Sequence, residues 1–469
     1  MNINIEQQKQ DQLSSVLVCF IKEDATHSFS SEIQEILRVH DFSGKKEQIV
    51  CTPSFGTTQG DKIIFAGIGT GDENNIRLSA RAAGNHARKK GLSHLTLDLH
   101  GFSHTSALNC IISFAAGNYR FDKYKVSKPK TDGIESLSIL GDIDEKVLLH
   151  ANGLIEGRNF CRDLVNGPPA EIYPETLAQA ARDMANDQIT VVVWNEDKLK
   201  EENMNGIIAV GQGSSNPSRF IHLHYKPKGE ARKKIALVGK GVTFDAGGLS
   251  LKPSAGMLTM RCDMGGAGTV LGIFRSLADL QPDVEVHGLI GAVENMCAAN
   301  SYKLGDILTM KNGKTVEVHN TDAEGRLVMA DCLAYGSDLG VDYMLDIATL
   351  TGACVVALGN FYTALFSNEE DLCAQLISSA NHTGEGLWRM PLPDFYKPML
   401  KAEWGDIKNV GGRAAGSITA GLFLSEFVTN TKWAHLDIAG SAFYNSPFQH
   451  LENGGTGSMV ETLYHWIAS

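Results

Sequence analysis

Short apolar runs rich in β-branched residues alternate with amphipathic segments along most of the chain. In the N-terminal part, residues 15–21, 62–67 and 95–99 have the length and composition of strands, whereas 77–90 and 112–119 have the apolar spacing of helices. An alternation of this kind is typical of α/β proteins, so we expect a mixed, mainly parallel sheet.

The same alternation continues through the C-terminal part. Several of its apolar runs are almost uniformly hydrophobic, as in strands that are covered on both faces. Strands are predicted at 190–194, 220–225, 234–238, 284–292, 342–350 and 432–438, and helices at 174–187, 265–277, 323–337, 370–382 and 420–429.

A polar, punctuated segment at about 127–142 interrupts this pattern and is followed by a helical pattern. A chain of 469 residues is too long for one ordinary compact core. The sequence therefore predicts an N-terminal α/β domain over 1–142, a linker helix over 143–168 and a second domain over 169–469.

Composition narrows the possible partners and compartment. The formal net charge is -12, which disfavours nucleic acid and anionic membrane surfaces as partners. Residues 1–12 are polar and no stretch of eighteen apolar residues occurs, so we expect a cytoplasmic protein. The nine cysteines include no Cys-x-x-Cys pair and are expected to be buried thiols in a reducing compartment.

The octet at 320–327, Asn-Thr-Asp-Ala-Glu-Gly-Arg-Leu, places charged side chains at every second position. Asp322 and Glu324 could share a cation, and Arg326 could hold an anion beside it. A helix start, with Asp322 as the N-cap residue, explains the same pattern. The octet alone leaves both interpretations open.

Glycines surround a lysine and an aspartate at 239–248, directly after a predicted strand. They would let the backbone bring Lys240 and Asp245 together. A phosphate-binding Walker A loop is excluded, because Lys234 stands at the position of its first glycine and Gly241 follows the lysine. A strand-to-loop turn with a surface lysine remains the alternative.

Asp263 precedes a helix of small residues and could be its N-cap residue. Together with Asp245, Asp322 and Glu324, however, it could form a cluster of carboxylates contributed by loops. Such a cluster could not stay ionised without counter-charges, and two divalent cations would supply them. The residues therefore suggest a dinuclear metal site.

Seven segments, including those described above, resemble the M17 leucyl aminopeptidase (cytosol aminopeptidase) family of metallopeptidases. The resemblance covers most of residues 155–465. It implies a macro-domain-like N-terminal domain and a catalytic domain that is an α/β/α sandwich. The segments are 210–214, 239–253, 261–266, 310–318, 320–327, 346–353 and 433–440.

The resemblance also implies roles for individual residues. Lys252 would polarise the scissile carbonyl, and Arg326 would hold a bicarbonate that acts as general base on a metal-bridging water. The metal ions could be Zn or Mn, with Mg or Co as further possibilities. The implied ligands are Lys240, Asp245, Asp263 and Glu324 for one metal and Asp245, Asp322 and Glu324 for the other.

The activity implied by the resemblance is removal of the N-terminal residue from peptides with a free amine. Met260, Thr349 and Gly455 match positions of the family's pocket for the first side chain, which implies a preference for apolar residues such as Leu or Met. The family also implies a homohexamer.

Two other functions remain open. A dinuclear phosphohydrolase would use the same metals, although such enzymes normally recruit several histidines. An additional DNA-binding or regulatory role would need a basic surface patch. His222 and His224 could bind zinc from one strand face, but the sequence favours a solvated face for them.

Overall fold

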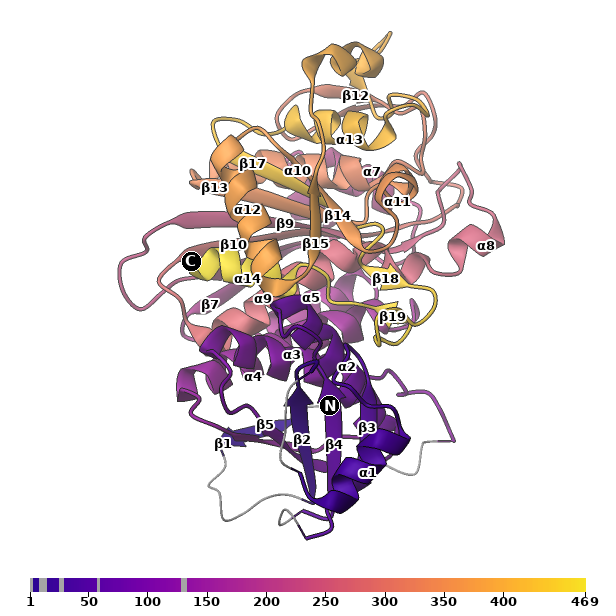
Figure 1. Cartoon of the computed structure of the whole chain (residues 1–469). Coiled ribbons are helices and arrows are strands. Elements are labelled where there is room, and N and C mark those ends of the chain that lie inside the picture. The colour runs from indigo at the N-terminus through magenta and orange to yellow at the C-terminus, as the bar shows by residue number, and fades with distance from the viewer. Residues whose placement is uncertain (1–2, 8–14, 25–28, 57–59, 128–132) are drawn as a thin grey trace. The chain divides into compact units, whose positions relative to one another are not determined.

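The computed structural model divides the chain into two compact units, and Figure 1 shows the elements of each. Unit 1 comprises residues 1–156 and 445–453, and unit 2 comprises 157–444 and 454–469. None of the helices in the described part of the chain has the length and hydrophobicity that a membrane span requires. The described residues are 3–7, 15–24, 29–56, 60–127 and 133–469.

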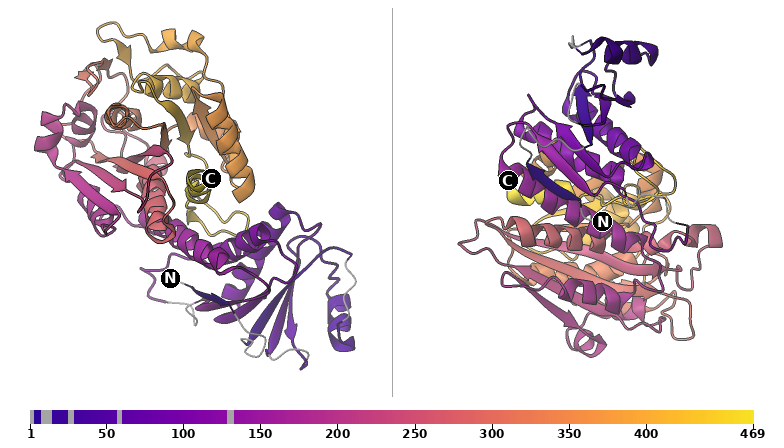
Figure 2. Two further views of the ribbon diagram at one scale, coloured as in Figure 1. Left: turned by 90° about the vertical axis from the view of Figure 1, so that its left-hand side faces the viewer. Right: turned by 90° about the horizontal axis from the view of Figure 1, so that it is seen from below.

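Unit 1 is built on a six-stranded sheet in the order β1-β6-β5-β2-β4-β3. Figure 2 shows this sheet in the indigo and purple part of the ribbon. Neighbouring strands run parallel except for β3 and β4. The strands are β1 (Asn4–Gln7), β2 (Val16–Ile21), β3 (Ile49–Pro53), β4 (Lys62–Gly67), β5 (His94–Asp98) and β6 (Ser136–Leu140), and the helices are α1 (Ser31–Val39), α2 (Glu73–Lys89), α3 (His104–Asn118) and the first part of α4 (Glu145–Asn166).

Strand β6 lies within the polar segment in which the sequence predicted no strand. Its apolar residues alternate with serines, and Leu137 and Ile139 are fully buried. The alternation is too short to stand out beside the charged and proline-containing residues that precede it.

Residues 445–453 return from the C-terminal part of the sequence to unit 1. Glu452 forms an ion pair with Arg88 of α2. His450 Nε2 lies 2.6 Å from Glu47 Oε2. Unit 1 is therefore assembled from two distant parts of the chain.

Unit 2 contains an eight-stranded mixed sheet in the order β15-β14-β17-β13-β9-β10-β8-β7. The four central strands, from β17 to β10, are parallel. The α/β class and the mainly parallel sheets predicted from the sequence are confirmed. The strands are β7 (Ile189–Trp194), β8 (Arg219–Tyr225), β9 (Lys234–Asp245), β10 (Glu285–Asn295), β13 (Tyr343–Ala348), β14 (Tyr362–Ser367), β15 (Gly386–Arg389) and β17 (Lys432–Asp437).

Helices cover both faces of this sheet (Figure 1). One face packs against α7 (Asn205–Gly211), α10 (Gly325–Asp338) and α13 (Gly416–Ser425) in a large apolar core. The helices on the other face include α9 (Gly265–Leu280) and α14 (Val460–Ala468). Because the central strands are parallel, their carboxyl ends meet at one edge, where α/β folds place their sites.

The nine cysteines lie in described segments and none forms a disulfide. Five are buried and three are intermediate, but Cys297 is exposed, contrary to the prediction of burial.

Candidate active site

Strand β9 carries two of the predicted site residues. It runs through Lys240 to Asp245 instead of ending at residue 238, so these residues are not in a loop as predicted. The glycines within β9 serve close packing: a Cβ on Gly239 would lie 2.9 Å from the backbone of Ala267. The chain turns only after Asp245, where Gly247 has a φ of +89°.

The carboxylates interpreted alternatively as helix caps do not cap helices. The residue before α10 is Glu324, and no side chain caps that helix. Asp263 lies within the short 3-10 helix η1 (Met260–Met264), and the residue before α9 is Met264, again without a side-chain cap. The N-cap interpretation is therefore wrong for both Asp322 and Asp263.

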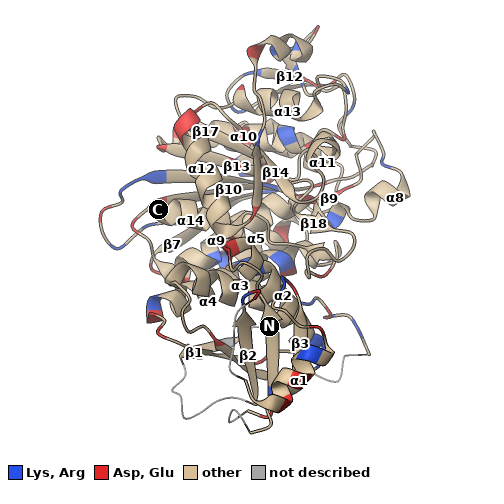
Figure 3. Ribbon diagram, in the orientation of Figure 1, with Lys and Arg blue, Asp and Glu red and all other residues tan. Residues whose placement is uncertain are grey.

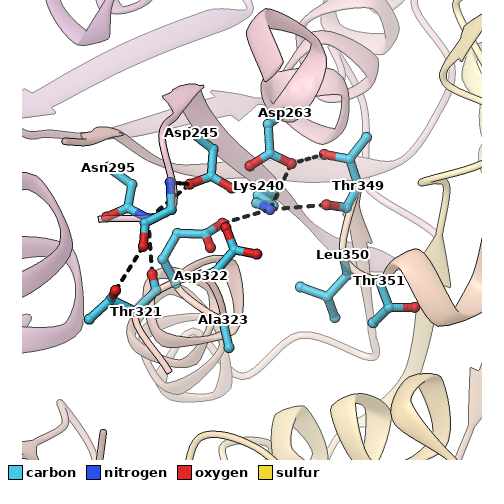
Figure 4. Close-up of polar contacts among 12 residues, drawn as sticks. Lys240, Asp245, Asp263, Asn295, Thr321, Asp322, Ala323, Thr349, Leu350 and Thr351 are labelled. Carbon is cyan, nitrogen blue, oxygen red and sulfur yellow. Dashed lines mark hydrogen bonds and ion pairs between the residues drawn. The ribbon is translucent and has the colours of Figure 1, made fainter. Parts of the chain in front are cut away.

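Two lysines lie among four carboxylates. Figure 4 shows one of them, Lys240, bonded to Asp263 and Thr349. Lys240 Nζ is 2.7 Å from Asp263 Oδ1 and 2.9 Å from Glu324 Oε1. Lys252 Nζ is 2.8 Å from Asp245 Oδ2 and 2.5 Å from Asp322 Oδ1. Carboxylate oxygens of three of these residues lie within 4.8 Å of one another, close enough to hold a metal ion together: Asp245, Asp322 and Glu324.

The cluster carries an excess of negative charge in a buried place. Burial raises the pKa of Asp245, and the nearby charge of Glu324 raises it further, although Lys252 opposes both effects. Burial also raises the pKa of Asp263. Asp263 Oδ2 is buried and has no hydrogen-bond partner among the described residues. Because two ammonium groups cannot neutralise four carboxylates, the donor set fits divalent cations.

Lys240 is almost fully buried. Burial lowers its pKa, but the charges of Asp263 and Glu324 outweigh burial, so the pKa is raised overall. A divalent cation beside the amine would reverse this balance, because a metal-bound amine must be neutral. Lys240 can therefore act either as a counter-ion or as a ligand.

Arg326 is buried behind the cluster, in the first turn of α10. Its Nη1 donates to the Asn409 carbonyl at 2.9 Å. Its Nε has no partner among the described residues, and burial lowers its pKa to about 10. The guanidinium thus keeps donor capacity for a small anion.

Two buried amides that the sequence analysis did not single out hold the loops in place. Asn295 Nδ2 donates to Asp245 Oδ1 at 2.8 Å and to the Thr321 carbonyl at 2.9 Å. The side chain of Asn409 bonds the backbone of the octet at Asn320 and Ala323. Asn295 could have been found as a polar residue that ends a buried strand, whereas no local signal marks Asn409.

The three predicted pocket residues differ in how they are connected to the cluster. Thr349 follows β13, and its hydroxyl donates to Asp263 Oδ1 at 2.8 Å while its carbonyl accepts from Lys240. Met260 begins the same short helix that carries Asp263. Gly455 is buried against α4, where a Cβ would lie 2.9 Å from Val165.

Comparison with known proteins identifies the family of this chain. Residues 159–464 match the catalytic domain of the cytosol aminopeptidase family, M17, and residues 9–128 match its N-terminal domain. The chain belongs to the cytosol aminopeptidase family. Members of this family use divalent metal ions, and the chain is accordingly a metal-dependent aminopeptidase, a hydrolase.

Relatives and solved structures agree with this assignment. The chain is 42% identical over 448 residues to a probable cytosol aminopeptidase of Aquifex aeolicus, covering 93% of this chain and 90% of the relative. A relative of the same name from Persephonella marina is 40% identical over 458 residues, with 94% and 92% covered.

Among solved structures, the bottromycin maturation enzyme BotP in complex with Mn has a TM-score of 0.89 and 31% identity, covering 97% of this chain and 99% of its own. A tomato leucine aminopeptidase variant has a TM-score of 0.89 and 33% identity, covering 100% of this chain and 96% of its own.

Proposed function

We propose that this aminopeptidase removes apolar N-terminal residues, such as Leu or Met, from peptides with a free amine. The observation that carries the proposal is the buried cluster of four carboxylates around Lys240 and Lys252. This donor set matches two divalent metal ions, with Zn or Mn preferred and Mg or Co also compatible. The ligands would be Lys240, Asp245, Asp263, Asp322 and Glu324.

The metals would supply Lewis-acid activation of the attacking water and of the scissile carbonyl. The chain would supply the remaining groups. Lys252, whose side chain keeps 17% exposure, would donate to the developing oxyanion. Asp263, with its unpartnered Oδ2, would bind the substrate's N-terminal ammonium or amine. The need for a free N-terminal amine would restrict the enzyme to the N-terminal ends of peptides.

Arg326 would orient a bicarbonate that takes the proton of the attacking water. Its buried guanidinium with a vacant Nε donor supports this role. The cluster contains no histidine, so a borrowed base would supply what the side chains do not.

Thr349 and Met260 would line the pocket for the first side chain, because they flank Asp263. Gly455 would act indirectly, by letting the C-terminal strand pair pack closely on α4. We further propose that the enzyme assembles as a homohexamer, which sedimentation of the purified protein would test.

The test is hydrolysis of Leu-p-nitroanilide by metal-loaded protein. Lys252→Ala should lower kcat by about 10²- to 10³-fold through loss of oxyanion stabilisation. Asp245→Ala and exhaustive chelation should abolish activity through loss of the metals. The matched control is Lys432→Ala, which removes an exposed lysine of the same sheet.

Full activity after chelation, or in Lys252→Ala, would refute this mechanism. Release of phosphate from p-nitrophenyl phosphate without peptide cleavage would favour the phosphohydrolase alternative. Salt-sensitive DNA binding that survives Glu324→Ala would establish an additional DNA-binding role. Figure 3 shows the positions of Lys and Arg and of Asp and Glu along the ribbon of both units.

A further inference from the structure

A second cluster of metal-ligating side chains lies on strands β8 and β10. His224 of β8 is paired in register with His287 of β10, and Glu285 lies two residues before His287 on the same strand face. Glu285 begins β10, whereas Asn295 at the other end of that strand contacts the active site. With a rise of about 3.3 Å per residue, the two sites are roughly 30 Å apart.

Three ligand atoms converge in this cluster. His224 Nε2 lies 2.8 Å from Glu285 Oε1, and His287 Nε2 lies 3.4 Å from the same oxygen. All three atoms lie within 4.8 Å of one another. In a tetrahedral zinc site with bonds of about 2.0–2.1 Å, neighbouring ligand atoms are about 3.3 Å apart. The rings of His224 and His287 are stacked, with centroids 4.1 Å apart and 16° between their planes, so sharing a metal ion would require the partly exposed His224 ring to rotate about its Cβ–Cγ bond.

The surrounding hydrogen bonds favour the tautomers that ligation requires. His287 Nδ1 lies 2.9 Å from His222 Nε2, and His222 Nδ1 lies 3.2 Å from Tyr335 Oη. If His287 Nε2 is bare, Nδ1–H donates to His222, and His222 Nδ1–H in turn donates to Tyr335. Metal-binding histidines characteristically use their second nitrogen in this way.

The charges around the cluster also suit a cation. Burial and the nearby histidines lower the pKa of His287 to about 3 and that of His222 to about 4, so both rings are neutral at pH 7. Lys234 Nζ lies 3.6 Å from Glu285 Oε2, whereas His224 contacts the other carboxylate oxygen, Oε1. Side-chain exposures of 19% for His224 and 17% for Glu285 leave a route for an ion.

The sequence-based prediction that His222 and His224 form a solvated strand face was therefore wrong. Both are partly buried, and they contact His287 and Glu285, which lie more than sixty residues away in the chain.

We propose that His224, His287 and Glu285 form a further site for a divalent transition-metal ion of the Zn²⁺ class, separate from the peptidase centre. Two imidazoles and one carboxylate suit this class of ion and leave a coordination position for water. Such an ion would join β8 to β10 and stabilise that part of the sheet.

The experiment exploits a chemical difference between the two sites. The peptidase ligands are lysine and carboxylates, so imidazole ligation reports on the second site alone. Zinc-loaded full-length protein should show imidazole scattering in its X-ray absorption spectrum, and the metal content measured by mass spectrometry should fall by one zinc per chain in His287→Gln and in Glu285→Gln. Glu285→Gln keeps the shape of the side chain, so its fold should be preserved.

The control is His100→Gln, because His100 Nδ1 also lies 2.7 Å from a carboxylate oxygen, of Asp98, but without a second histidine. This variant should keep the full zinc content and the imidazole signature. Equal zinc content in the wild type and Glu285→Gln would overturn the proposal, as would an absence of imidazole ligation in the wild type. Neither readout depends on peptidase turnover.

Discussion

At the residue scale, the position of Lys240 depends on the absence of a side chain at Gly325. A Cβ at Gly325 would lie 2.4 Å from Lys240 Cε and 2.6 Å from its Nζ. Since Gly325 is also the first residue of α10, an alanine there would favour the helix by up to about 1 kcal/mol. An alanine at this position would therefore favour the helix but displace the side chain of Lys240.

We predict that Gly325→Ala displaces the Lys240 amine and lowers metal affinity at least about tenfold, equivalent to 1.4 kcal/mol. Calorimetric titration with Mn²⁺ and hydrolysis of Leu-p-nitroanilide would measure the effect. Gly229→Ala is the matched control, because a Cβ there would meet no atom within 4 Å. Unchanged affinity in Gly325→Ala would show that Lys240 is not a ligand.

The sequence analysis singled out the charged residues of the cluster but not the amide side chains that hold them in place. Lys240, Asp245, Asp263, Asp322 and Glu324 stood in segments with a recognisable spacing, and the structure brings them together. Asn409 bonds the octet from almost ninety residues away, and such a contact leaves no trace in a local pattern. The histidine cluster was misjudged for the same reason, because it depends on the pairing of two strands.

At the scale of elements, the long helices of unit 2 and its central strands other than β9 were predicted to within a few residues. Their uniform hydrophobicity reflects burial on both faces, which is a strong local signal. Short elements such as β1 and β15 were missed, because four residues carry too little periodicity. The extension of β9 to Asp245 was also missed, because its glycines indicate turns unless the packing partner is known.

Helices α12 (Glu370–Thr383) and α14 face each other with stacked histidines, and this contact should make stability depend on pH. The rings of His382 and His465 are 4.1 Å apart. Burial, and then the neighbouring His382, lower the pKa of His465 to about 4, below the ordinary value near 6.5. The unfolded state therefore binds more protons between these values, and stability should fall as the pH drops from 6.5 towards 4.

Unfolding midpoints in urea, measured from pH 7 to pH 4, would test this prediction. His465→Gln should flatten that part of the profile, since it removes the titrating group. His100→Gln, which alters an exposed histidine, should leave the slope as it is in the wild type. A slope that is unchanged in His465→Gln would contradict the assignment.

At the scale of the whole molecule, the two units should respond differently to the loss of metal. The carboxylates of the active site lie in unit 2, and their mutual repulsion would be released by chelation. A ligand at 100 times its dissociation constant stabilises the folded state by about 2.7 kcal/mol. We predict that chelation accelerates amide hydrogen exchange in residues 245–253 and 320–326, whereas strands β2 and β4 of unit 1 keep their protection.

Hydrogen exchange with peptide-level mass spectrometry would measure this difference in the presence and absence of 1,10-phenanthroline. An equal change in both units would show that the metals act on the stability of the whole chain and not on the cluster.

The return of residues 445–453 to unit 1 affects the order in which the protein can fold during synthesis. When the first 156 residues leave the ribosome, Glu452 and His450, which contact Arg88 and Glu47, have not yet been translated. Unit 1 can acquire its sheet at that time, but it can complete its contacts only when synthesis is almost finished. A nascent chain stalled before residue 445 would therefore carry an N-terminal unit that is less stable than the same unit in the finished protein.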